Sequence, residues 1–91
     1  MRLRVGVTIK GIVQGVNYRY YTMEKALQHN VMGWVRNLAN GDVEGCFEGE
    51  ESDVKDLIDW CRTGPPRARV DEVIVESEPS KDEFTEFHVR H

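Results

Sequence analysis

The sequence has 91 residues, enough for one compact domain with a single hydrophobic core. Its formal net charge of −4 argues against a nucleic-acid-binding module, because such modules bind largely by neutralising phosphates. No apolar run approaches the length of a membrane span, and the chain opens on strand-like residues without a signal-peptide pattern. We therefore expect a cytoplasmic protein that binds neither nucleic acid nor membrane.

The first part of the chain predicts a strand, a helix and a second strand. Residues 3–13 alternate between apolar and polar side chains, which is typical of a half-buried strand. A helix is expected over residues 18–30, where Tyr20, Met23 and Leu27 recur at helical spacing as its apolar stripe. A strand is expected over residues 31–39.

Asn40-Gly41 is a strong hairpin signal, because both residues tolerate positive φ. Its partner strand is expected over residues 42–48. The clearest helix of the chain follows over residues 51–62, and Gly64-Pro65-Pro66 ends it. Its apolar residues fall at i, i+3, i+4 and i+7, which gives one stripe made of Val54, Leu57, Ile58 and Cys61.

Two further strands complete the chain. The fourth contains Val70, Val73 and Val75 and ends near Pro79, and Phe84, Phe87 and Val89 indicate a short last strand. The order is β-α-β-β-α-β plus a short final strand, which is the α+β, ferredoxin-like arrangement. We expect residues 1–91 to form a single domain with two helices on one face of an antiparallel sheet. This fold hosts many activities and does not select one.

The two cysteines are not expected to pair. Cys61 falls on the apolar stripe of the second helix, whereas Cys46 alternates in phase with Glu44 and Glu48 on what reads as the polar face of a strand. Thiols on opposite sides of a sheet cannot meet disulfide geometry. Free thiols, buried or half-exposed, agree with a reducing compartment.

The candidate chemistry lies in the stretch from Gly11 to Arg19. A strand there runs into a glycine-bounded turn and ends on one arginine at the start of a helix. Backbone N–H groups at a helix N-terminus, together with a guanidinium, suit a tetrahedral oxyanion. The charge is also uneven, net +5 over residues 1–41 and −9 over residues 42–91, so this part would attract a small anion. By itself, Arg19 equally fits a surface ion pair.

A second candidate is Asn37, which closes the run Gly33-Trp34-Val35-Arg36-Asn37 just before the hairpin turn. Asn is depleted inside strands, and its amide both donates and accepts, so it could orient a water. Considered alone, it more readily fits a strand-end cap. The histidines 29, 88 and 91 are scattered and make no metal-like spacing with either cysteine, so no metal site is expected.

Together the two motifs, Gly-x-Val-Gln-Gly-Val-x-aromatic-Arg and Gly-Trp-Val-Arg-Asn, closely resemble the signature of the acylphosphatase family. The resemblance covers nearly the whole chain, including Asn40–Gly45 and Gly64-Pro65-Pro66. It implies a ferredoxin-like enzyme that hydrolyses the carboxyl–phosphate bond of acyl phosphates to a carboxylate and inorganic phosphate, without a metal or other cofactor. It further implies a monomer whose partners are the small-molecule substrate and the phosphate product.

Residue by residue, the resemblance implies that Arg19 binds phosphate and that Asn37 orients a directly attacking water. The remaining phosphate contacts would be backbone N–H groups of the loop formed by Gln14, Gly15, Val16, Asn17 and Tyr18. Tyr18 stands where the family usually has Phe, so an extra hydroxyl is expected at the cradle.

Three other functions stay open. A catalytically silent phosphate binder would need Arg19 but not Asn37. A module of a larger machine, as in hydrogenase-maturation proteins, would be expected to carry a linker. An RNA-binding or metal-handling domain of this fold would show basic, aromatic-rich central strands or paired cysteines, whereas residues 42–48 hold three acids and one aromatic.

Overall fold

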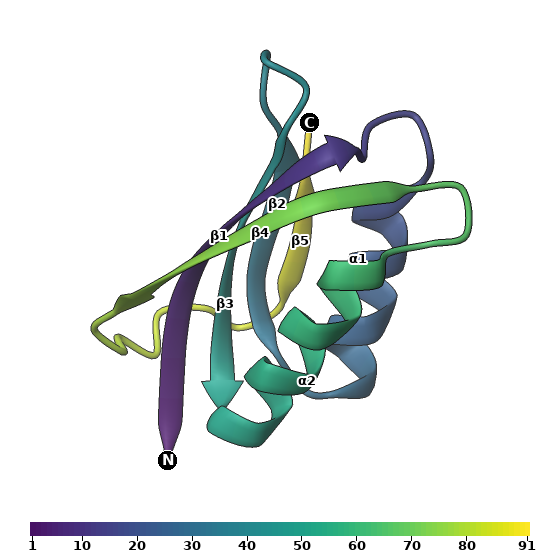
Figure 1. Cartoon of the computed structure of the whole chain (residues 1–91). Coiled ribbons are helices and arrows are strands. Elements are labelled where there is room, and N and C mark those ends of the chain that lie inside the picture. The colour runs from purple at the N-terminus through teal and green to yellow at the C-terminus, as the bar shows by residue number, and fades with distance from the viewer.

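The computed structural model describes residues 1–91, with two helices packed on one face of a five-stranded sheet (Figure 1). Its elements in chain order are β1 (Arg2–Ile12), α1 (Tyr18–Gln28), β2 (Met32–Asn37), β3 (Val43–Glu50), α2 (Glu51–Thr63), β4 (Arg69–Glu78) and β5 (Phe87–Arg90). The predicted ferredoxin-like order is therefore confirmed, including the short final strand. No helix is long and apolar enough to cross a membrane.

The sheet has the strand order β4-β1-β3-β2-β5 and is mixed, not purely antiparallel as the sequence predicted. β1 pairs antiparallel with β3 and β4, and β2 pairs antiparallel with β3, but β5 runs parallel to β2. The difference arises because β4 and β5 lie at opposite edges, so residues 79–86 must cross the sheet before β5 begins. A connection that crosses can enter the far edge in the same direction as its neighbour.

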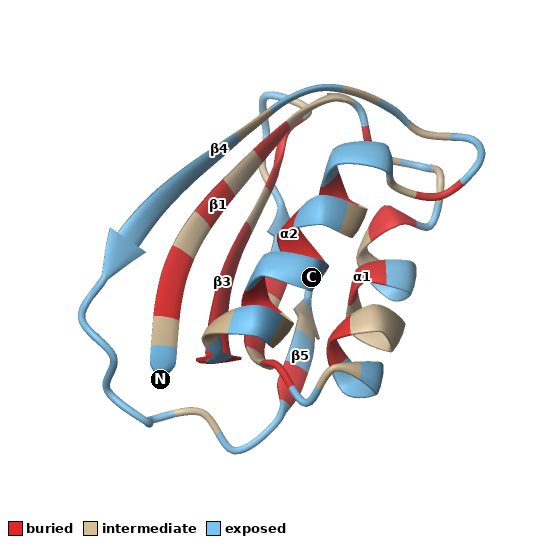
Figure 2. Ribbon diagram, turned by 60° about the horizontal axis from the view of Figure 1, so that its bottom comes forward, coloured by how far each residue is buried: buried red, intermediate tan, exposed pale blue.

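The core lies between the sheet and the two helices (Figure 2). The predicted stripe of α2 is confirmed, because all four of its members are buried. The predicted stripe of α1 is wrong: Tyr20 and Leu27 are 51% and 59% exposed, and the helix instead buries Tyr18, Thr22 and Ala26. Thr22 and Ala26 have small side chains, so α1 can lie close to the sheet. The helical spacing of the large apolar residues did not reveal this buried face.

The two thiols are free and both buried, with Cys61 in the core and Cys46 among the residues of the opposite sheet face. Their predicted separation is confirmed, although Cys46 is more enclosed than a polar strand face implies. Burial raises the pKa of Cys46 to about 11 and that of Cys61 to about 12, so both are neutral thiols at physiological pH.

The crossing segment is fixed by a buried carboxylate on the sheet face opposite the helices. One oxygen of Glu48, Oε2, accepts hydrogen bonds from the Ser80 hydroxyl at 2.7 Å and from the backbone N–H groups of Lys81 at 2.8 Å and Asp82 at 3.3 Å. Burial alone would raise the pKa of Glu48, but these hydrogen bonds and the charge of Arg4 hold it below its ordinary value. Arg4 also bonds Glu83.

Most element boundaries differ from the prediction by one or two residues, and two elements, α1 and β2, end two residues earlier than predicted. Helix α1 ends at Gln28 because Asn30 adopts a left-handed conformation with φ 57°, and β2 ends at Asn37 before a five-residue loop. In that loop only Gly41 has positive φ, and the Leu38 N–H bonds the Asp42 carbonyl oxygen at 2.8 Å. The hairpin was correctly predicted, but the turn is wider than a two-residue one.

Candidate active site

The loop between β1 and α1 presents its backbone N–H groups outward. Gly15 and Asn17 have φ of 75° and 62°, and this alternation turns successive N–H groups toward the same side. No N–H group of residues 15–19 donates a hydrogen bond within the chain, and the Asn17 side chain does not cap the helix. The first turn of α1 contains no acidic residue. The loop and the helix N-terminus therefore form a seat for an anion.

A half-open pocket of about 410 Å³ lies in front of this loop. Its polar lining comes from the loop, the end of β2 and the C-terminus, and consists of Gln14, Gly15, Asn17, Arg19, Asn37 and His91. Its apolar lining consists of Val13, Tyr18, Tyr20, Met23 and Val89. The two residues that the sequence singled out for catalysis thus lie in one pocket, although 18 positions separate them in the chain.

Arg19 is the only Asp, Glu, Lys or Arg residue that lines the pocket, and it forms no ion pair with an acidic side chain. Its Nη1 donates to the backbone carbonyl oxygen of Arg90 at 2.7 Å and lies 3.5 Å from Nδ1 of His91. The end of β5 therefore holds the guanidinium without neutralising it. An unpaired positive charge beside free N–H groups favours a doubly charged oxyanion.

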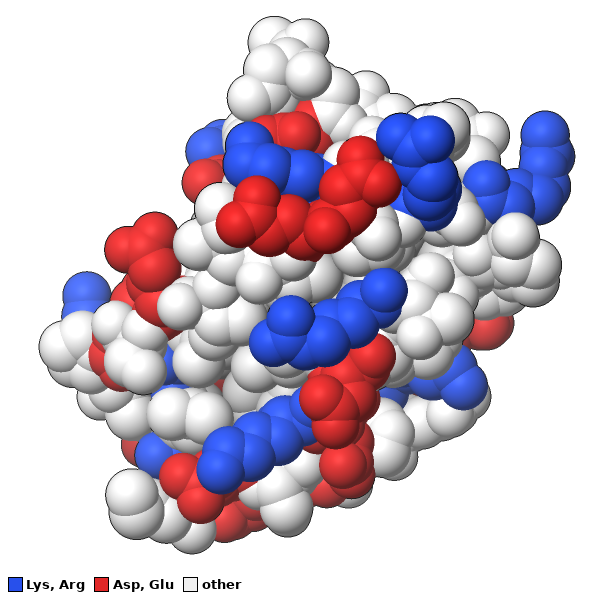
Figure 3. All heavy atoms as spheres, in the orientation of Figure 1, with Lys and Arg blue, Asp and Glu red and all other residues white.

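Elsewhere on the molecule many charges are paired, and six of the 12 Lys and Arg side chains form ion pairs with acidic side chains. The face in Figure 3 shows acidic and basic side chains interleaved rather than a continuous basic surface. Ion pairs such as Arg4–Glu78 at 3.0 Å, Arg36–Glu44 at 2.6 Å and Lys10–Asp42 at 2.8 Å account for much of this pattern. The hydrogen bond with Asp42 raises the pKa of Lys10. Within the pocket, the attraction of a side chain for a small anion comes from Arg19, because no other Lys or Arg lines it.

Gln14 connects the cradle loop to the loop that follows Asn37. Its side-chain Nε2 donates to the carbonyl oxygens of Leu38 at 2.8 Å and Asp42 at 2.9 Å. Asn40 stiffens the same loop, since its Oδ1 accepts from the Asp42 N–H at 3.0 Å. These two bonds engage the amide nitrogen of Gln14, so its side chain has a positioning role.

Two predicted cradle residues contribute differently from the expectation. The Tyr18 hydroxyl does not lie at the cradle: it donates to the backbone carbonyl oxygen of Cys61 at 2.7 Å, and the side chain is only 1% exposed. Burial raises the pKa of this phenol. Val16 packs against the core and does not line the pocket. Both side chains anchor the loop from below, and the backbone N–H groups of both residues have no partner within the chain.

Sequence reasoning missed the C-terminal contribution to this site. The Arg90 carbonyl, His91 and Val89 reach the pocket because β5 pairs in parallel with β2, with Val35 opposite Val89. A contact between residues 71 positions apart has no local signal in one sequence. The helical spacing of Tyr20, Met23 and Leu27 was visible in the sequence, but it indicated a helix and did not indicate that Tyr20 and Met23 line a pocket.

One group of possible metal ligands exists, away from the pocket. His29, Asp53 and Asp56 place one ligand atom each within 4.8 Å of one another between α1 and α2. None of the three lines the pocket, so this group has no part in the site described above.

Comparison with known proteins agrees with the motifs. The family model described as Acylphosphatase matches residues 5–89. A relative named Acylphosphatase from Geotalea uraniireducens is 57% identical over 91 residues, covering 100% of both chains. A solved acylphosphatase from Coxiella burnetii is 38% identical with a TM-score of 0.93, covering 98% of this chain and 93% of that one.

A solved acylphosphatase from Bacillus subtilis is 28% identical with a TM-score of 0.94, covering 98% of this chain and 99% of that one. Sequence, fold and full-length coverage thus lead to the same assignment. The chain belongs to the acylphosphatase family, the enzymes that hydrolyse acyl phosphates.

Proposed function

We propose that Arg19 and the N–H groups of the 14–19 loop hold the phosphoryl group while Asn37 orients the attacking water. The observation that carries this proposal is the shared pocket, in which an unpaired guanidinium, a free N–H loop and an amide converge from three elements. Asn37 stands at the exposed end of β2, where its amide is reachable by solvent. It can accept a hydrogen bond from the water and donate one to a phosphoryl oxygen.

The chemistry needs no more than this set of groups. Water attacks phosphorus, a new P–O bond forms, and the bond from phosphorus to the acyl oxygen breaks. The departing carboxylate takes the bonding electron pair, and because its conjugate acid has a pKa of about 4, it leaves without protonation. The proton of the water passes to a phosphate oxygen or to solvent. Catalysis is then positioning and charge stabilisation in the transition state.

The test is hydrolysis of benzoyl phosphate, followed by absorbance, with and without EDTA. Asn37→Ala should lower kcat by about 10²–10³, the usual effect of removing one group that serves the transition state. Arg19→Ala should raise the inhibition constant of inorganic phosphate. Arg19→Lys should not restore phosphate binding, because lysine cannot bind two oxygens in a plane. Activity should resist EDTA.

Arg36→Ala is the matched control, since Arg36 neighbours Asn37 in the chain, pairs with Glu44 and does not line the pocket. It should retain wild-type kcat. Full activity in a folded Asn37→Ala protein would refute the water-orienting role, and unchanged phosphate inhibition in Arg19→Ala would refute the cradle.

We also infer that residues 1–91 act as a single monomeric domain in the cytoplasm, with no nucleic-acid or membrane partner. The single core and the separated free thiols support this inference. Light scattering on the purified protein should give a mass near 10.5 kDa, and a dimer mass would contradict it.

A further inference from the structure

We propose that the pocket contains an acyl subsite, formed by Met23, Val89 and Tyr20, that selects acyl phosphates with an apolar, uncharged acyl group. This inference rests on the proposed placement of phosphate at Arg19. A phosphate has five non-hydrogen atoms, which would fill about 150 Å³ even at the ~30 Å³ that a liquid water occupies. More than half of the 410 Å³ pocket is left for the rest of the substrate.

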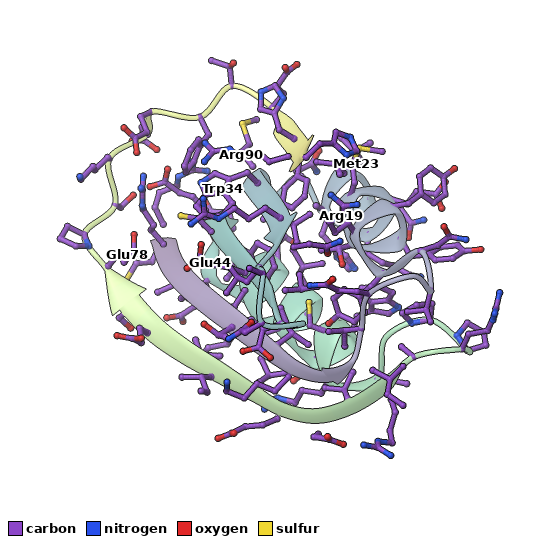
Figure 4. The ribbon with its side chains drawn as sticks, turned by 90° about the horizontal axis from the view of Figure 1, so that it is seen from above. Arg19, Met23, Trp34, Glu44, Glu78 and Arg90 are labelled. Carbon is purple, nitrogen blue, oxygen red and sulfur yellow. The ribbon has the colours of Figure 1, made fainter.

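The remaining space has a consistent chemical character. Met23 lies one helical turn after Arg19 on α1, and residues at this spacing share a face of a helix. Val89 comes from β5, next to the Arg90 carbonyl that holds Arg19. Figure 4 labels Arg19 and Met23 beside each other at α1. The apolar wall is therefore adjacent to the cradle.

This wall is pre-formed. Met23 and Val89 both pack against the hydrophobic core, so they are half-buried and still line the pocket. The Tyr20 hydroxyl donates to Glu24 at 2.8 Å, and its ring stands edge-on to Tyr21 with centroids 5.5 Å apart. Because its hydroxyl is hydrogen-bonded, Tyr20 presents its ring as a fixed apolar surface. The flexible thioether side chain of Met23 can adapt to acyl groups of different shape.

The apolar wall also favours apolar over charged acyl groups. Met23, Val89 and Tyr20 offer no charged partner, the only Lys, Arg, Asp or Glu side chain of the pocket is Arg19, and His91 lies beside Arg19. A charged acyl group would therefore gain nothing from contact with this wall. The half-open form allows chains of different length. The predicted class is aliphatic or aromatic monoacyl phosphates larger than acetyl phosphate.

The test is a series of acetyl, butyryl and hexanoyl phosphate, each assayed for kcat/KM. Full burial of one methylene corresponds to about fourfold in binding, and a half-open wall should give about twofold per methylene. Hexanoyl phosphate, with four more methylenes than acetyl phosphate, should then exceed it by roughly tenfold or more. Succinyl phosphate, which carries a second carboxylate, should fall below butyryl phosphate.

Met23→Gln keeps the length of the side chain but adds a polar amide, and it should reduce the hexanoyl-to-acetyl ratio at least fivefold. Met23→Leu should retain the ratio. Met32→Ala is the matched control, because Met32 lies on β2 outside the pocket, and its ratio should equal that of wild type. Should Met23→Gln fail to fold, the slope of the wild-type series and the Tyr20→Ser ratio decide, with Leu27→Ser, at an exposed apolar position of α1 outside the pocket, as control.

Equal kcat/KM values for acetyl, butyryl and hexanoyl phosphate in wild type (a flat series) would overturn the acyl subsite. An unchanged hexanoyl-to-acetyl ratio of kcat/KM in folded Met23→Gln would overturn it as well. The outcome is separate from that of the proposed function, which is decided by Arg19→Ala. Arg19-dependent hydrolysis with a flat series refutes the subsite and keeps the cradle. A steep series with Arg19-independent hydrolysis refutes the cradle, and the subsite falls with it.

Discussion

Replacing Gln14 by alanine tests whether one side chain couples the two halves of the active site. Its Nε2 bonds the carbonyl oxygens of Leu38 and Asp42, so the cradle loop and the loop after Asn37 share one donor group. Each carbonyl keeps one other partner, since Leu38 O also accepts from Gly41 N–H and Asp42 O from Leu38 N–H. No buried acceptor is orphaned by the substitution.

The magnitude follows from these contacts. Two neutral hydrogen bonds at about 0.5–1.5 kcal/mol each, without a desolvation penalty, give a loss of about 1–3 kcal/mol in the free energy of unfolding. For a domain of this size, that loss lowers Tm by roughly 4–24 °C. Loss of the link also frees Asn37 relative to the proposed phosphate-binding loop, and we expect kcat/KM to fall by about tenfold or more.

The assays are urea denaturation and benzoyl phosphate hydrolysis, each on Gln14→Ala and Gln14→Glu. The glutamate variant should be worse than alanine, because its carboxylate accepts hydrogen bonds only and would face two carbonyl oxygens. Gln28→Ala is the control, since Gln28 is exposed and forms no side-chain hydrogen bond. A change in unfolding free energy below about 0.3 kcal/mol, with unchanged kcat/KM, would show that the two loops are positioned independently.

Three further changes report on the scaffold. Gly33→Ala should lower the free energy of unfolding by at least about 4 kcal/mol or prevent folding, because the φ of Gly33 is 137° and a Cβ there would lie 1.8 Å from the carbonyl oxygen of Cys46. The control is Gly49→Ala, where a Cβ would have no contact under 3.5 Å, and it should cost less than about 1 kcal/mol in urea titrations. Glu48→Ala should cost about 3 kcal/mol by the same measurement, since it removes the acceptor of three hydrogen bonds; a loss below about 1 kcal/mol would contradict this role. The thiols of Cys46 and Cys61 have pKa values near 9 in the unfolded chain and about 11 and 12 in the folded protein. The free energy of unfolding should therefore not depend on these thiols below pH 9 and should fall as the pH rises above 9. Equilibrium unfolding at pH 8–10.5 should show a shallower fall for Cys46→Ala than for wild type, and an equal slope would refute the raised pKa of Cys46.

Local sequence patterns correctly predicted the strands and helices whose buried residues recur with the period of the strand or helix itself. The alternation of β1 and the stripe of α2 reflect a single buried face, so residues two or three to four apart reveal it. The order of elements then gave the fold. The α1 stripe was wrong because Tyr20 and Leu27 are exposed, and Tyr20 lines the pocket instead of the core.

The sequence by itself determined the family and the glycine-bounded loop, and it singled out Arg19 and Asn37 as the proposed catalytic pair, because both motifs are contiguous and their residue types are set by chemistry. The tertiary structure decided what surrounds them. Three hydrogen bonds join residues that are distant in the chain. They run from Arg19 to the Arg90 carbonyl, from Gln14 to the 38–42 loop, and from the Tyr18 hydroxyl into the core. Such contacts depend on which strands become neighbours, and the parallel pairing of β5 with β2 follows from a crossing segment fixed by Glu48 rather than from any local preference.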